Sequence, residues 1–208
     1  MNYTLQILSV ISGVIPALAA LFNYKQIDVV LKVFVLYLLI SFCFDIGFWL
    51  AQQNGTRNDM PGVHAYIAVS LALFTGIYYL LFIKIALKKA IIALSAITSG
   101  LIIYDAFKIW VFPSISNTAL SIFLIICSLI YFYQLLSRQE FIYIEKQGLF
   151  WINAGVLFYS AVNIFFFMII GQLPKAMQSN VFMIHSSTNI IANILFTIGL
   201  LCQPQKTT

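Results

Sequence analysis

Charged residues are scarce in this chain of 208 residues. Only 8% of the residues are charged, 62% are hydrophobic, and the mean hydropathy is +0.99. A soluble domain carries about 25% charged residues. A chain this apolar has too little polar side-chain area to cover a surface in water. The composition therefore excludes a soluble globular protein and predicts an integral membrane protein.

Basic runs, metal-binding cysteine patterns and glycine-rich loops are also missing. The net charge is +5, but no run of Lys and Arg is long enough for a nucleic-acid patch, so no nucleic acid is expected as a partner. Cys43, Cys127 and Cys202 fall in or at the end of apolar segments. Their odd number and their spacing predict neither a disulfide nor a cysteine metal site. No glycine-rich segment precedes a helix to cradle phosphate.

A basic start is absent as well. Residues 1–4 contain no Lys or Arg, and the first basic residue, Lys25, follows the first apolar run. A secretory signal peptide needs a basic segment before its apolar core. We therefore expect residues 4–23 to be retained as a first membrane span.

Apolar runs of spanning length recur along the whole chain. Because backbone polar groups in lipid must be satisfied within the segment, each run is predicted to be a helix. The connections are short, so consecutive helices should be antiparallel neighbours. The sequence predicts one all-α domain over residues 1–208, a bundle of seven transmembrane helices at about 4–23, 29–51, 64–84, 90–112, 118–137, 149–171 and 180–202.

The basic residues give this bundle a direction. Eight of them fall on one side of the predicted membrane and three on the other, and cytoplasmic loops carry the excess of Lys and Arg. This bias predicts an N-terminus outside and a cytoplasmic C-terminus. The inner side receives Lys25, Lys32, Lys84, Lys88, Lys89, Arg138, Lys146 and Lys206, and the outer side Arg57, Lys108 and Lys175.

Polar residues within the predicted helices concentrate in the outer half. Ionisable groups at membrane depth are costly and normally face the bundle interior or a water-filled cavity. Their convergence predicts a polar pocket open to the outside. The alternative is a structural polar core, in which Lys108 pairs with Asp105 or Asp45 and the amides join helices. The candidate pocket residues are Ser41, Asp45, His64, Asp105, Lys108, Asn163, His185 and Asn189.

Two kinds of chemistry remain open for these residues. His64, His185, Asp45 and Asp105 are the candidate ligands for a zinc ion that would activate water. No two of them form an i, i+4 ligand pair on one predicted helix, so no catalytic residue is assigned. The buried carboxylates also suit proton-coupled transport of a small solute. Transporters, however, tend to have paired broken helices, and only Pro16 suggests a break here.

Three resemblances bear on these alternatives. Seven helices resemble rhodopsins, but no Lys lies between Asn180 and Cys202, so retinal binding is not expected. Ser41-x3-Asp45 and His185-x3-Asn189 resemble the hydrolase superfamily of alkaline ceramidases and adiponectin receptors. That resemblance implies an intramembrane zinc-dependent lipid hydrolase. Asn189 stands where the family has a second His, which leaves the implied zinc site incomplete.

The third resemblance is to small uncharacterised seven-span proteins of Gram-negative bacteria. It rests on His64-Ala65-Tyr66, on residues 150–163 (FWINAGVLFYSAVN) and on residues 185–196 (HSSTNIIANILF). Such proteins are often encoded beside sensor histidine kinases. The resemblance implies a sensory or accessory role in the bacterial inner membrane, without a catalytic residue.

Together these observations favour a membrane sensor or accessory signalling subunit. It would bind a small or lipid-like ligand in the outer pocket, without a required cofactor. The longest inner loop, residues 138–148, contains apolar residues among its charges and would dock a signalling partner such as a membrane kinase, or lie on the bilayer surface.

Overall fold

The computed structural model describes residues 3–24, 27–55, 58–137, 144–169 and 175–202. Within these ranges the chain is helical and contains no strand, as the apolar runs predict. The elements are α1 (Tyr3–Ser12), α2 (Val14–Asn23), α3 (Val29–Gln53), α4 (Met60–Leu81), α5 (Ile85–Ala106), α6 (Ser114–Leu136), the 3-10 helix η1 (Ile144–Lys146), α7 (Gly148–Ile169) and α8 (Lys175–Leu201).

The first predicted helix is two helices. Instead of one span over 4–23, α1 ends at Ser12 and α2 begins at Val14. Pro16 has no N–H to donate to the carbonyl of Ser12, and its ring crowds that carbonyl, so a regular helix cannot pass this point. The chain tightens locally, and the Gly13 N–H bonds to the Val10 carbonyl at 3.1 Å.

The boundaries of the fourth predicted helix are also wrong. It was expected over 90–112, but α5 spans Ile85–Ala106. The start is earlier because Lys88 and Lys89 lie within the helix instead of in a loop. The end is earlier because the chain then passes through turns, in which Lys108 N–H bonds to Asp105 O at 3.0 Å and Val111 N–H to Lys108 O at 2.9 Å.

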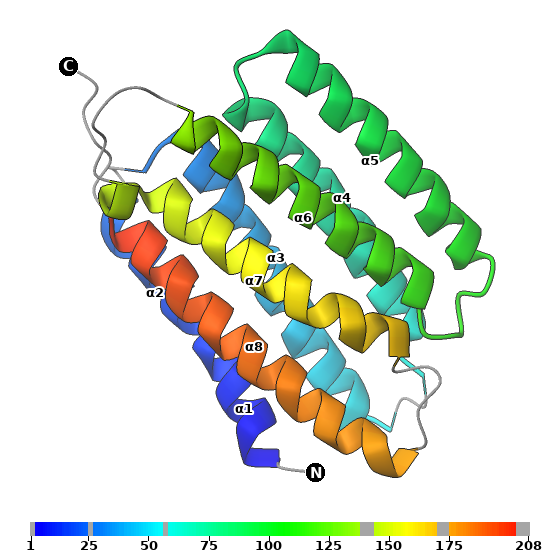
Figure 1. Cartoon of the computed structure of the whole chain (residues 1–208). Helices are drawn as coiled ribbons and strands as arrows, with labels where there is room; N and C mark the ends of the chain where they lie inside the picture. The colour runs from blue at the N-terminus through cyan, green and yellow to red at the C-terminus, as the bar shows by residue number, and fades with distance from the viewer. Residues whose placement is uncertain (1–2, 25–26, 56–57, 138–143, 170–174, 203–208) are drawn as a thin grey trace.

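Within the described chain, six helices form a closed ring, and α1 joins it through its contacts with α8 and α2. The contacts join α2 to α3, α3 to α4, α4 to α6, α6 to α7, α7 to α8, and α8 back to α1 and α2. Figure 1 shows these helices running side by side along one common direction, with α1 and the last turn of α8 at opposite ends of the bundle. The ring encloses the space in which a pocket can form.

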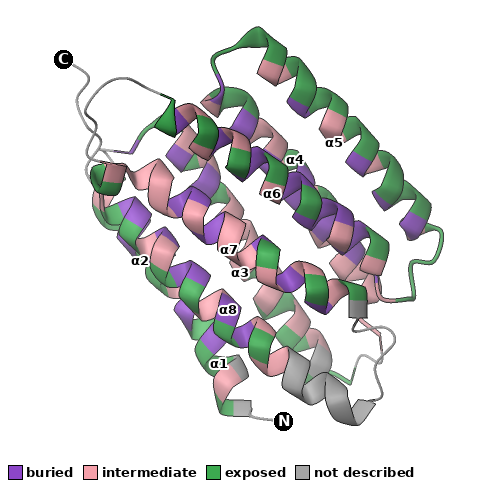
Figure 2. Ribbon diagram, viewed as in Figure 1, coloured by how far each residue is buried: buried purple, intermediate pink, exposed green. Residues whose placement is uncertain are grey.

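The helix α5 lies outside this ring. It packs on α4 and α6, at the edge of the bundle (Figure 1). In its most apolar 18-residue window only 17% of the residues are buried, compared with 44% for α6. Much of its surface is exposed in Figure 2. Side chains on α5 therefore reach the ring interior only by passing between α4 and α6.

Six of the helices are long and apolar enough to cross a membrane, namely α3 to α8 over their described residues. Large apolar side chains cover the outside of the bundle, among them Phe22 and Phe107, each 86% exposed. Such a surface is stable against lipid and not against water. The chain is thus a helical integral membrane protein.

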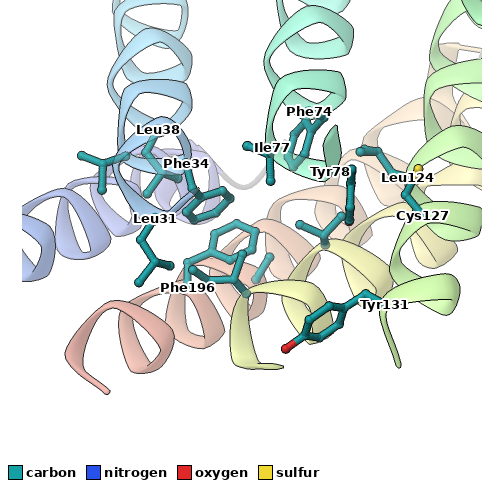
Figure 3. Close-up of a cluster of buried hydrophobic side chains, with 14 of the residues drawn as sticks. Leu31, Phe34, Leu38, Phe74, Ile77, Tyr78, Leu124, Cys127, Tyr131 and Phe196 are labelled. Atoms are coloured by element: carbon teal, nitrogen blue, oxygen red, sulfur yellow. The ribbon is translucent and has the colours of Figure 1, made fainter. Parts of the chain in front are cut away.

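An apolar core fills the ring toward the C-terminal end of α8. Phe34 on α3 meets Phe196 on α8 edge-to-face, with ring centroids 5.0 Å apart. Figure 3 shows this cluster, with Tyr78 of α4 on its α6 side. The Tyr78 hydroxyl lies 2.8 Å from Ser128 Oγ and 3.0 Å from Asn153 Oδ1. This half of the ring is closed by packed side chains.

Two glycines bring α7 and α8 together at that end. A Cβ atom on Gly199 would lie 2.7 Å from the Gly148 carbonyl oxygen and 2.8 Å from Cγ1 of Ile152. Only a residue without a side chain allows the two helix backbones to approach this closely. A Cβ atom on Gly100 of α5, in contrast, would have no heavy atom of another part of the chain within 4 Å among the described residues.

We therefore expect Gly199→Leu to lower the free energy of unfolding in detergent by about 1–3 kcal/mol, because overpacking forces α7 and α8 apart. The same substitution at the open site, Gly100→Leu, should change it by less than about 0.5 kcal/mol. Equal effects of the two substitutions, measured by denaturant titration, would contradict the close α7–α8 contact.

Candidate functional site

A cavity of about 350 Å³ lies inside the ring. Its lining comes from the later part of α3, the first half of α4 and of α6, the second half of α7 and much of α8, together with Phe112. The alternating chain direction puts these segments in one half of the bundle, the half that contains α1. Eight phenylalanines and three tyrosines are among the lining residues, so the wall is strongly aromatic.

One wall is a polar stripe on α3. Tyr37, Ser41 and Asp45 follow one another at four-residue spacing and all line the cavity, as expected for side chains on one helix face. Tyr66 on α4 joins the stripe, since its hydroxyl lies 3.2 Å from the Tyr37 hydroxyl and 3.1 Å from Ser41 Oγ. These hydroxyls satisfy one another and fix α3 against α4.

Three polar groups in the cavity wall, on Asp45, Ser70 and Ser160, have no hydrogen-bond partner in the described chain. Asp45 is half-buried, and no hydrogen bond or ion pair joins its carboxylate to any residue in the described ranges. Ser160 on α7 is 1% exposed, and its Oγ has no partner in the same part of the chain. A buried polar group without a partner costs free energy, and native proteins contain few of them.

His185 on α8 is held by Asn163 on α7. Asn163 Nδ2 donates to the carbonyl oxygen of Tyr159 at 2.9 Å, which turns its Oδ1 toward His185 Nδ1 at 2.6 Å. Because Oδ1 can only accept, Nδ1 donates, and Nε2 of the neutral ring is left as an acceptor. The imidazole also stacks on Phe166, with ring centroids 5.0 Å apart. His185 lines the cavity, and Asn163 positions it.

Two asparagines of α8 tie the cavity to the first helix. Asn193 Nδ2 donates to Ser12 Oγ at 2.8 Å, and the Ser12 hydroxyl in turn donates to the Ser9 carbonyl at 2.7 Å. Asn189 Nδ2 donates to Ser9 Oγ at 2.9 Å. Both amides therefore donate a hydrogen bond from their nitrogen to a serine of α1. Their oxygens remain as acceptors in a cavity that both residues line.

Asp105 and Lys108 were expected in the pocket, but neither is among the described residues that line the cavity. Asp105 is 9% exposed, and its Oδ2 accepts from the backbone N–H of Ser116 at 3.0 Å and from the Ser116 hydroxyl at 2.8 Å. It satisfies an orphan N–H in the first turn of α6. Lys108 lies beyond the end of α5 and is exposed. Neither side chain lines the cavity because α5 lies outside the ring.

His64 was also expected in the pocket and lies beside it. Its Nε2 is 3.3 Å from the Val111 carbonyl oxygen and, facing a group that can only accept, is the donor. Asn58 Nδ2 donates to the neighbouring Trp110 carbonyl at 2.8 Å. These bonds anchor the α5–α6 connection to the start of α4, and Phe112 of that connection lines the cavity.

The candidate zinc ligands are not gathered at one point. His64 bonds to Val111, His185 to Asn163, and Asp105 to Ser116. Within the described ranges, no group of three or more His, Cys, Asp or Glu is arranged to hold a metal ion. The Ser41, Asp45 and Asn189 positions of the hydrolase resemblance do line the same cavity as His185.

Several lining residues were not among the candidates. Asn117 and Ser121 on α6 are four residues apart, a spacing that could have been noticed in the fifth run. Both bond to their own helix, Asn117 to the Pro113 carbonyl and Ser121 to the Asn117 carbonyl. The aromatic wall gives no such signal, because phenylalanine is equally common on surfaces that face lipid.

Part of the predicted docking loop, residues 138–143 of 138–148, lies outside the described residues. Within the remainder, residues 144–146 form η1, and Trp151 Nε1 donates to the Glu145 carbonyl there at 2.8 Å. This segment is at the opposite end of α7 and α8 from the cavity.

The fold and the cavity define the class: an α-helical integral membrane bundle with an aromatic, partly polar cavity in one half. In comparisons with known proteins, no family model matches the chain, and no curated protein or solved structure is significantly similar to it.

The hydrogen bonds predict opposite tautomers for the two histidines. In neutral protein, His185 should carry its proton on Nδ1 and His64 on Nε2, which ¹⁵N spectra of imidazole-labelled protein distinguish. Asn163→Ala should shift His185 toward the Nε2–H form that predominates in free histidine, and His64 should not respond. An Nε2–H form of His185 in the unmodified protein would contradict the Asn163 contact.

A second prediction concerns Asp105. Asp105→Ala leaves the Ser116 N–H and hydroxyl without their acceptor and should lower the free energy of unfolding by about 1–3 kcal/mol. Lys108→Ala, three residues further along, should change it by less than about 0.5 kcal/mol because that side chain is exposed. A larger loss for Lys108→Ala than for Asp105→Ala would favour the ion-pair interpretation of this segment.

Proposed function

We propose that this protein spans the bacterial inner membrane seven times, with its N-terminus outside. Six spans correspond to the long helices α3 to α8. The broken pair α1 and α2 supplies the seventh, and its contacts with α8 along the bundle support this assignment. The excess of Lys and Arg on the predicted inner side supports the orientation. With this orientation the cavity lies in the outer half.

The protein, in this proposal, binds a small or lipid-like ligand in the cavity. The observation that carries the proposal is an aromatic cavity inside the ring whose wall contains polar groups without protein partners in the described chain, among them Asp45 and Ser160. Ligand sites combine an apolar lining with a few convergent polar groups. A ligand that bonds to these groups removes the cost of leaving them unsatisfied.

A sensory or accessory role is the activity that fits such binding best. It follows from the resemblance to small seven-span proteins encoded beside sensor histidine kinases. The inner segment 138–148 is the proposed contact with a signalling partner. Binding alone is sufficient for this role, so no reacting group is required in the cavity.

Filling the cavity tests the proposal. A library of lipids and small apolar compounds should contain some that raise the unfolding temperature of the purified protein. A ligand at a hundred times its Kd stabilises by about 2.7 kcal/mol. Ser160→Leu adds a bulky side chain without removing any bond of Ser160, and should abolish the stabilisation. Ser99→Leu, on α5 outside the ring, should preserve it.

Two results would refute ligand binding in this cavity. One is a library without any stabilising compound. The other is stabilisation that persists unchanged in Ser160→Leu, which would move the ligand to another part of the protein.

A further inference from the structure

We propose that the ligand of this cavity is an organic cation, a protonated amine carried on an apolar or aromatic body, with Asp45 as its counter-ion. This inference rests on the proposed ligand-binding function and specifies its chemistry.

The charged side chain in the described cavity wall is acidic. Asp45 lines the cavity, and no Lys or Arg is found among the described lining residues. The Asp45 carboxylate has no hydrogen bond or ion pair within the described chain. A buried carboxylate is normally paired, because its desolvation is otherwise uncompensated. A positively charged ligand supplies the missing partner.

The free polar atoms around the cavity are mostly acceptors. His185 uses Nδ1 toward Asn163, which leaves Nε2 of the neutral ring to accept. Asn189 and Asn193 use their Nδ2 atoms toward Ser9 and Ser12, which leaves two amide oxygens. The assignment for Asn193 is fixed because the Ser12 hydroxyl already donates to the Ser9 carbonyl. A wall of acceptors selects a ligand that brings N–H donors.

The rings beside Asp45 also favour a cation. Phe44 directly precedes Asp45 on α3. Phe48 lies four residues after Phe44, one helical turn further along, and therefore on the same side of the helix as Phe44. The centroids of the Phe44 and Phe48 rings are 5.9 Å apart, and Tyr66 lies 5.3 Å from Phe44. All three line the cavity. Aromatic faces attract ammonium groups, most strongly where water is excluded. An alcohol gains nothing comparable, and a carboxylate would be repelled by Asp45.

The experiment compares three compounds that share one body: 4-phenylbutylamine, 4-phenylbutanol and 4-phenylbutyrate. Their binding to the purified full-length protein in detergent is measured by calorimetry at neutral pH, against empty micelles. We expect the amine to bind at least about tenfold more tightly than the alcohol, because a buried charge pair is worth more than a neutral contact. The carboxylate should not bind.

Substitutions then test whether Asp45 is the residue that pairs with the bound amine. Asp45→Asn should weaken amine binding at least about tenfold and leave alcohol binding within about twofold. Asp59→Asn, a carboxylate near the start of α4 that does not line the cavity, is the matched control and should change neither. Phe48→Leu keeps an apolar wall without the ring and should weaken the amine more than the alcohol.

The outcomes separate the two proposals. Equal binding of amine and alcohol, as a protonated and uncharged Asp45 would give, overturns the cation inference but leaves ligand binding standing. Preference for the carboxylate, or no binding by any of the three, also overturns the cation inference. Should Asp45→Asn fail to fold, the comparison of the three compounds on the unmodified protein still decides.

Discussion

The cost of leaving a polar side chain unpaired inside an apolar bundle is the constraint on which the rest of this structure depends. Polar side chains there are therefore normally paired within the protein. Most do so close by: Asp105 at the start of α6, His64 at the Val111 carbonyl, and Tyr78 between Ser128 and Asn153. Against this background, the Asp45 carboxylate and the Ser70 and Ser160 hydroxyls have no partner in the described chain and line one cavity, while the buried Nδ1 of His64 is a further unpaired atom outside it.

The same constraint determines which atoms of the cavity remain available. Asn163, bonded to the Tyr159 carbonyl, must present an oxygen to His185, so the ring must donate from Nδ1. Ser12, already donating to Ser9, must accept from Asn193. Each structural bond thus consumes a donor and leaves an acceptor on a residue of the cavity wall. Under the proposed function, the bonds that hold α7, α8 and α1 together would also favour a ligand with donors.

The sequence predicted position along the helices better than position around the bundle. The apolar runs and polar interruptions indicate where along a helix a residue lies, so Ser41, Asp45, His185 and Asn189 were expected in one half of the bundle, and all four line one cavity. The angular position of a helix depends on which neighbours it packs against, and no local pattern encodes that. Asp105 bonds to Ser116 in the first turn of α6, at the end of the bundle where the cavity lies, but α5 lies outside the ring and Lys108 lies beyond its last residue. The break between α1 and α2 at Gly13 had one signal in the sequence, the proline at position 16.

One helix connects the cavity to the far end of the bundle. In its middle α8 provides His185 and Asn189 to the cavity wall, and near its end Gly199 packs directly on Gly148 at the beginning of α7. Cys202 Sγ, just past that end, lies 3.8 Å from the Glu145 carbonyl in η1. Under the proposed sensory function, a ligand that shifts α8 relative to α7 would act on the segment before Gly148. The glycine contact leaves no flexible side chain between the two backbones to absorb such a shift, so under this proposal the displacement would reach the proposed docking segment.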